Sequence, residues 1–236
     1  MTDSCEHPDL TSVALFPLPN VVLFPRAVLP LHIFEERYKQ MTADALAGDR
    51  TIAMALLRAG WEKSYYGRPP IEPVVCVGKI LTHEKLPDGK YNFLLQGTTR
   101  ARVTREDAAD ERGYRIAQLQ PMEQTRPLEI DLSDERERMM RLFDSGSLAR
   151  TCLAKQFRQF LTGAVPLPTA DVADLIAFYL LEDVALKQSL LAECETRSRV
   201  LRTLDALEEV ASHLPVSTPY IPPAAVNYSL KHPDMN

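Results

Sequence analysis

The sequence predicts an α+β fold, in which a small curled β-sheet or pseudo-barrel with one or two helices precedes an α-helical bundle. Three observations indicate this. Prolines divide short apolar runs in the first forty residues, Asp88-Gly89 separates two β-patterned runs, and beyond Leu128 the apolar residues recur at helical spacing. Residues 10–122 hold 15 Lys and Arg against 12 Asp and Glu, whereas residues 123–236 hold 12 against 17. We expect a β-barrel subdomain at 10–122, a helical bundle at 123–214 and a proline-rich tail at 215–236.

The stretch Leu15–Tyr38 bends repeatedly because proline fixes its own φ and donates no backbone hydrogen bond. We interpret Val21–Phe24 and Val28-Leu29 as two short strands with corners between them. The apolar spacing in His32–Leu46 is typical of an amphipathic helix, and Gly48 is expected to end it.

The next segment, Thr51–Leu57, is a short apolar run that favours a buried strand. Residues 60–73 then form a predicted loop that is rich in glycine, proline and aromatic residues. The aromatic residues of this loop that have no evident core role are Trp61, Tyr65 and Tyr66.

The strongest local signal is a β-hairpin. A strand over Val74–Leu86 leads into Asp88-Gly89, a pair that favours a tight turn because glycine tolerates positive φ. We expect strands at Lys90–Gln96 and Thr98–Thr104, interrupted by Gly97, and a last strand at Tyr114–Leu119.

The helical half is predicted from apolar spacing and capping residues. Helices are expected after Ser133, over Leu148–Leu161, after Thr169, after Asp183, and over Thr196–Leu214, where a short heptad seam favours packing inside a bundle.

The composition excludes several classes of protein. No apolar run approaches the roughly 20 residues of a membrane-spanning helix, and the acidic, polar N-terminus lacks the features of a signal peptide, so we expect a cytoplasmic protein without a membrane partner. The four cysteines form no CxxC pair and have no metal-ligand spacing with histidine. We expect no metal and no cofactor, and reduced cysteines, with Cys76, Cys152 and Cys194 buried.

Motifs for nucleotide hydrolysis and for a serine nucleophile are absent. The two Gly-Lys pairs, at Gly78 and Gly89, precede Ile80 and Tyr91 and not the Ser or Thr of a phosphate-binding loop. No Gly-x-Ser-x-Gly elbow occurs. We therefore expect a protein that is not an enzyme, with an enzyme of unrecognised type as a remaining alternative.

The chain resembles the N-terminal, substrate-binding domain of the Lon protease family. The resemblance rests on four patches in the family's order: Phe16-Pro17-Leu18 through Leu29-Pro30-Leu31; Val77–Ile80; Leu86–Lys90 followed by Gly97–Val103; and Asp171–Ala177 with Lys187-Gln188 and the closing heptad helix. It implies a PUA-like β pseudo-barrel followed by a helical bundle.

Two local features are more similar to stand-alone Lon-domain proteins than to full-length proteases. The second predicted strand leads into a helix through Ile33-Phe34-Glu35-Glu36-Arg37-Tyr38, as it does in the stand-alone proteins. At Pro19-Asn20, the full-length proteases usually have Arg-Asp instead. Because Pro215 ends the last helix, we expect neither the ATPase nor the peptidase module in this chain.

The resemblance implies a non-catalytic module that binds unfolded or exposed hydrophobic segments of other polypeptides, with a link to protein quality control and with a protease or another protein as a further partner. We expect the binding groove to be built from Leu29, Leu31, Phe34, Trp61, Tyr65 and Tyr66. Alternatively, Trp61 only plugs the end of the barrel.

A second function class is nucleic-acid binding, because PUA-like barrels elsewhere hold RNA. The basic strip for it would consist of Arg100, Arg102, Arg105, Arg112 and Arg115. Solvated arginines on a sheet face are the simpler interpretation, and the acidic bundle disfavours a long phosphate track. We instead expect Arg100 and Arg102 to pair with carboxylates such as Glu84.

Overall fold

The computed structural model describes residues 10–64, 67–108 and 111–213. Tyr65, Tyr66 and the 215–236 tail, to which the sequence assigned roles, lie outside the described residues. Within them, strands occupy the first half and helices the second, which confirms the predicted α+β class.

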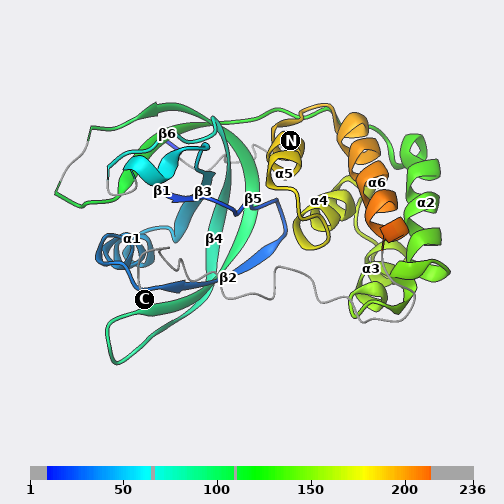
Figure 1. Cartoon of the computed structure of the whole chain (residues 1–236), viewed down its shortest axis with the longest axis horizontal. Helices are drawn as coiled ribbons and strands as arrows, with labels where there is room; N and C mark the ends of the chain where they lie inside the picture. Colours follow the sequence, from blue (N-terminus) through cyan, green and yellow to red (C-terminus); the bar gives the residue numbers. More distant parts are fainter. Residues whose placement is uncertain (1–9, 65–66, 109–110, 214–236) are drawn as a thin grey trace, which may run out of the picture.

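Six strands form one sheet in the order β2-β5-β4-β3-β1-β6, and β5 also pairs with β6, so that five of the strands close into a barrel with β2 at its edge. The β part consists of β1 (Val13–Leu18), β2 (Val28–Ile33), α1 (Glu36–Ala47), β3 (Thr51–Leu56), a 3-10 turn η1 (Trp61–Ser64), β4 (Val74–Lys85), β5 (Tyr91–Glu106) and β6 (Arg115–Pro121). Figure 1 shows this curled sheet with α1 beside it, on the side away from the other helices.

The helical part contains η2 (Glu129–Leu132), α2 (Ser133–Asp144), η3 (Ser147–Arg150), α3 (Ala154–Thr162), α4 (Thr169–Tyr179), α5 (Val184–Ala192) and α6 (Thr196–His213). Asp183 caps α5 as predicted, since its Oδ1 accepts a hydrogen bond from the Leu186 amide at 2.9 Å. In Figure 1, α4 and α5 lie between the sheet and the outer helices α2, α3 and α6.

The predicted strand at Val21–Phe24 is wrong, because this segment has no regular secondary structure and pairs with no strand. All four of its side chains are buried. Its last carbonyl lies so close to Gly97 that a Cβ on Gly97 would be 2.1 Å from the Phe24 oxygen. The segment is therefore a buried connection between β1 and β2 that packs across β5.

The predicted interruption at Gly97 is also wrong, because β5 runs unbroken from Tyr91 to Glu106. A register shift on the β4–β5 ladder between Val77 and Gly78 absorbs the irregularity instead. The hairpin that precedes β5 is confirmed: Gly89 has φ +81°, and the Leu86 amide donates to the Lys90 carbonyl at 2.8 Å.

The barrel and the helices share one apolar core, which extends from residues of β1 and α1 to Leu207 of α6. A smaller cluster on the other face of β3 contains Ala53 and Ala55. The strands end at Pro121 and the helices begin at Glu129, so we keep the division near residue 123 as a proposal about folding units.

A buried ion pair joins the sheet to the helices. Arg100 of β5 bonds Asp174 of α4 through both Nη atoms, and its Nε donates to the Leu191 carbonyl at 3.0 Å. Arg100 thus pairs with a carboxylate, as expected of this arginine, but the expected partner, Glu84, was wrong.

The expected burial of the cysteines holds only for Cys76. Cys152 is exposed because it lies in the turn between η3 and α3, and Cys194 is half-buried in the connection between α5 and α6. Among the described residues, no helix has the length and apolar character needed to cross a membrane.

Candidate functional site

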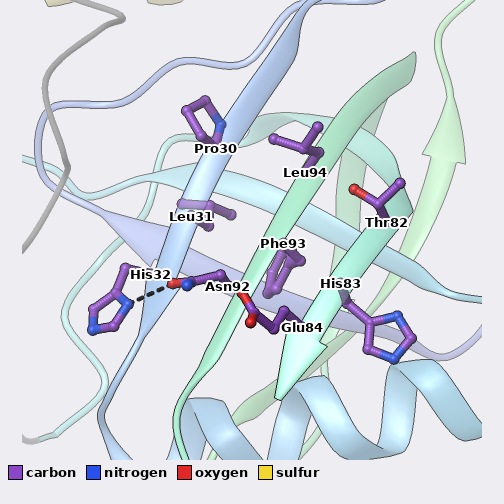
Figure 2. Close-up of a pocket in the computed structure, with 9 residues that line it drawn as sticks. All are labelled: Pro30, Leu31, His32, Thr82, His83, Glu84, Asn92, Phe93 and Leu94. Carbon is purple, nitrogen blue, oxygen red and sulfur yellow. Dashed lines mark hydrogen bonds between the residues drawn. The ribbon is translucent and has the colours of Figure 1, made fainter. Parts of the chain in front are cut away.

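A groove opens on the outer side of the β2-β5-β4 part of the sheet and has a volume of about 620 Å³. Each of the three strands contributes three residues to it (Figure 2): Pro30, Leu31 and His32 from β2; Thr82, His83 and Glu84 from β4; and Asn92, Phe93 and Leu94 from β5. We call this surface the sheet groove.

The strand register arranges the outward-facing side chains of the sheet groove in two cross-strand rows. Leu94 is opposite Pro30 on one side and opposite Thr82 on the other. Asn92 likewise lies between His32 and Glu84, and its Oδ1 is 2.7 Å from the His32 Nδ1 (Figure 2). One row is therefore largely apolar and the adjacent row is polar.

The floor of the groove is fixed by the alternation of the strands, because successive side chains point to opposite faces. Leu31 and Phe93, which alternate with the outward rows, are buried in the core. Leu94 points the other way and keeps 37% of its surface exposed. The two outward-facing rows of the groove thus lie over a buried apolar layer.

A β-bulge in β4 adds one exposed apolar side chain, Leu81, directly before the groove residue Thr82. The register of β4 against β5 shifts between Ile80 and Thr82, which leaves Leu81 as an extra residue. Ile80 is buried, whereas Leu81 is 44% exposed. Leu81 and Leu94 are two of the few large apolar side chains that the described residues leave exposed.

The free edge of β2 is poorly suited to receive an additional strand. Because Gly97 donates to the Ala27 carbonyl, the alternation along β2 directs the backbone groups of Val28, Pro30 and His32 away from β5. The Tyr179 hydroxyl lies 3.3 Å from both the amide nitrogen and the carbonyl oxygen of Val28, and Pro30 has no N–H. Only His32 offers both backbone groups, so a ligand of the sheet groove must bind mainly through side chains.

The residues that line the sheet groove do not include a nucleophile paired with a base. His32 contacts an amide and not a hydroxyl or a thiol, and His83 and Glu84 are neighbours on one strand whose side chains point to opposite sides. An apolar row beside hydrogen-bonding groups fits a polypeptide segment that carries alternating apolar and polar side chains.

A second groove, of about 580 Å³, lies between the barrel and α5 and is lined by Trp61. Trp61 is half-buried and packs against the smaller core cluster. The opposite wall is formed by Val184, Ala185 and Ser189. This groove is separate from the sheet groove, with which it shares no lining residue.

The four described residues of the predicted binding groove lie in different places. Leu31 lines the sheet groove, and Phe34 lies beside it, with its ring centroid 6.3 Å from that of His32. Leu29 is fully buried in the same strand, and Trp61 lines the second groove. With Tyr65 and Tyr66 outside the described residues, a single groove made of these six residues stays a prediction.

The basic strip suggested for nucleic acid is not a continuous exposed surface, because two of its five arginines are buried. Arg100 is buried against Asp174, and Arg115 is buried with its Nε and Nη2 on the Glu106 carboxylate, at 2.9 and 2.6 Å. The Arg105 side chain, which is 68% exposed, lies 3.5 Å from Asp107. Two of the five arginines are thus paired inside the protein.

Leu94, Asn92 and His32 line the sheet groove but were not among the binding residues predicted from the sequence. One signal for the first of these was present: Leu94 is an apolar residue on the polar side of the alternation Tyr91–Gln96. No histidine, cysteine or carboxylate cluster suited to a metal ion occurs among the residues that the structure describes.

A family model described as the ATP-dependent protease La (LON) substrate-binding domain matches residues 12–209. Among curated proteins, the Lon protease of Desulfosudis oleivorans is 30% identical over 92 residues, which are 39% of this chain and 11% of that protein. The Lon protease of Brucella suis is 23% identical over 205 residues, 86% of this chain and 24% of that protein. The chain thus spans a quarter or less of the length of these two relatives.

Two solved structures have a similar fold. A Lon N-terminal domain protein from Xanthomonas campestris matches with a TM-score of 0.56 and 23% identity, over 87% of this chain and 99% of that one. The N-terminal domain of the Mycobacterium avium complex Lon protease matches with a TM-score of 0.64 and 14% identity, over 86% of this chain and 100% of that one.

Proposed function

The chain belongs to the family of Lon substrate-binding domains, and from this premise we propose that it is a non-catalytic recognition module that binds unfolded or exposed hydrophobic segments of other polypeptides. The observation that carries the proposal is the exposed apolar row of the sheet groove, Pro30 and Leu94, with the exposed Leu81 next to Thr82 on β4, in a chain matched by a substrate-binding family. A role in protein quality control in the cytoplasm, together with a protease partner, belongs to the same proposal.

The physical basis is the burial of apolar surface. Complete burial of a fully exposed leucine contributes about 1.5–3 kcal/mol, so covering the 37% of Leu94 and the 44% of Leu81 that are exposed contributes roughly 0.6–1.3 kcal/mol each. The polar row adds selectivity, because His32, Asn92 and Glu84 can bond the polar groups of an extended segment. The blocked edge of β2 favours recognition of side chains, so binding should depend on the apolar side chains that a segment carries.

The test is a calorimetric titration with a permanently unfolded, reduced and carboxymethylated polypeptide. We expect saturable binding that Leu94→Glu weakens by about tenfold or more, since that loss corresponds to about 1.4 kcal/mol. Val165→Glu is the matched control, because Val165 is an apolar side chain, 87% exposed, that does not line the groove.

Trp61 fluorescence, recorded in the same titration, reports on the second groove. A Trp61 signal that saturates while Leu94→Glu binds normally would move the recognition site to the groove between the barrel and α5. No binding up to about 100 µM, which means less than about 5.5 kcal/mol of binding free energy, would overturn the proposed function.

A further inference from the structure

A polar cleft of about 770 Å³ separates the middle of β5 from the first turns of α4 and α6. The turn at Pro25-Arg26 and the connecting segment 124–129 form its other walls. Its charged lining residues are Arg26, Arg100, Arg126, Glu129, Asp171, Asp174 and Arg199. We call this surface the arginine cleft.

The base of the arginine cleft holds two buried guanidinium groups and one carboxylate. Arg100, Asp174 and Arg199 are each 2% exposed or less. Asp174 bonds both Nη atoms of Arg100, at 2.5 and 2.9 Å, and these bonds engage both of its oxygens. Arg199 must share that carboxylate.

Arg199 does not satisfy all of its hydrogen-bond donors. Its Nη1 donates to the Glu193 carbonyl at 2.9 Å, and its Nε lies 3.1 Å from the Asp174 Oδ1. That Nε contact is an ion pair without hydrogen-bond geometry, so the buried Nε has no hydrogen-bond acceptor among the described residues. A buried donor without an acceptor costs about 1–3 kcal/mol, more when it is charged.

The charges around the cleft leave a surplus. Arg26 pairs with Asp171 at 2.5 Å, and Glu129 bonds the Thr169 amide and hydroxyl. Arg126 is exposed and has no charged partner among the residues described. Among the side chains that line the cleft, four guanidinium groups therefore face three carboxylates, Asp171, Asp174 and Glu129, and Glu129 also lies 3.6 Å from Arg136 outside the lining. The lining itself carries a surplus of one positive charge.

Other donors that line the cleft are already engaged. The Thr98 hydroxyl donates to the Val77 carbonyl and the Thr196 hydroxyl to the Thr125 carbonyl. The first turn of α4 is capped by Glu129, and that of α6 by Glu195. The side-chain amides of Gln96 and Gln124 also line the cleft, but the charged donors left there are guanidinium groups, which match the planar geometry of a carboxylate.

We propose that the arginine cleft is a binding site for a carboxylate group, held by Arg199 at its base and Arg126 at its rim. One negative charge balances the surplus of the lining, whereas a phosphate, with a charge of about −1.5 to −2, exceeds it and would be repelled more strongly by Asp171 and Asp174 than a carboxylate. The carboxylate can come from a small monocarboxylic acid or from the C-terminus of a polypeptide. The proposal does not depend on the sheet groove.

The test is an NMR titration of the full chain that follows the backbone amides and the Nε–H signal of Arg199. The probes are acetate, acetamide, trialanine with a free C-terminus, trialanine amide and inorganic phosphate. We expect saturable shifts around the cleft with acetate, with free trialanine or with both, and none with acetamide or trialanine amide. A response to both acids assigns the site to small carboxylates in general, and a response to trialanine alone assigns it to a polypeptide C-terminus.

Arg199→Gln should weaken carboxylate binding at least tenfold, and Arg126→Gln, which alters an exposed side chain and leaves the core intact, should weaken it several-fold. Arg102→Gln is the matched control, because Arg102 is exposed on the same strand as Arg100 and does not line the cleft. Equal shifts with amidated and free probes, tighter binding of phosphate, or no effect of Arg126→Gln would overturn the proposal, whether or not Arg199→Gln folds. These results leave unfolded-polypeptide binding at Leu94 as a separate measurement.

Discussion

Arg100 and Asp174, 74 positions apart in the chain, form a two-pronged ion pair in which the side chains are 1% and 3% exposed. The pair connects the middle of β5 to α4, and Arg199 of α6 contacts the same carboxylate. Asp174 of α4 therefore forms ion pairs with both the barrel and α6.

The first prediction concerns this aspartate. Asp174→Asn should lower the free energy of unfolding by about 3–5 kcal/mol, because it leaves two buried guanidinium groups without their counter-charge. Urea denaturation measures the change. Asp205→Asn is the control: Asp205 lies 3.5 Å from Arg138 with 68% of its side chain exposed, and exposed pairs contribute about 0–1 kcal/mol. Equal effects of the two substitutions would contradict the structural role of Asp174.

The elements that were predicted correctly are those determined by residues close together in the sequence. The Asp88-Gly89 hairpin, the Asp183 cap and the apolar seam of α6 each depend on residues within about one turn or one hairpin, and all three are present. The partner of Arg100 was not predictable in this way, because an arginine alternating with apolar residues on a strand looks solvated until a helix is known to cover that face.

The strand predicted at Val21–Phe24 was wrong, and Leu94 was not predicted as a groove residue, for a related reason. Both sequences have strand-like character, and only the tertiary arrangement decides which segment pairs and whether an outward side chain stays uncovered. Val21–Phe24 crosses Gly97 and does not join the sheet, whereas Leu94 is directed outward by the pairing of β5 with β2 and β4.

The second prediction tests the crossing at Gly97. Gly97→Ala should destabilise the protein by about 3 kcal/mol or more, because its Cβ would lie 2.1 Å from the Phe24 oxygen and 3.0 Å from the Cys76 Sγ, where the backbone has no room to move. Gly48→Ala is the control, since its nearest neighbour would be at 3.5 Å, an ordinary contact. We expect a change within about 1 kcal/mol there. Thermal unfolding of both variants measures the two changes in stability. A destabilisation by Gly97→Ala as small as that by Gly48→Ala would contradict the close contact between Gly97 and Phe24.

The third prediction separates the cysteines by reactivity. Burial raises the pKa of the Cys76 thiol to about 12, so its thiolate fraction at pH 8 is on the order of 1,000-fold below that of an ordinary cysteine. Iodoacetamide should therefore modify the exposed Cys152 in the native protein and Cys76 only after denaturation. Peptide mass spectrometry measures both. Rapid native labelling of Cys76 would show that the core around Gly97 opens readily.

The fourth prediction concerns Lys187, a buried cation whose Nζ donates to the Phe178 carbonyl at 3.0 Å near the end of α4. Burial lowers the pKa of Lys187 to about 8 from its usual 10.5. Between these values the unfolded chain binds more protons than the folded protein, so this residue makes the protein more stable as pH rises from 8 to 10.5. Below pH 8, Lys187 is charged in the folded protein as well as in the unfolded chain, so the full free-energy cost of burying its charge lowers the stability there.

Lys187→Met isolates this contribution, because the variant keeps every other titrating group. The free energy of unfolding of the wild type, minus that of the variant, should rise by on the order of 2 kcal/mol between pH 7 and 9.5. Using the difference matters, since the raised pKa values of Cys76 and Tyr38, each about 12, lower the stability of both proteins as pH rises further. Loss of the bond to Phe178 adds an offset but no slope. Urea titrations at the two pH values measure the difference, and a constant value would mean that Lys187 reaches solvent in the native state.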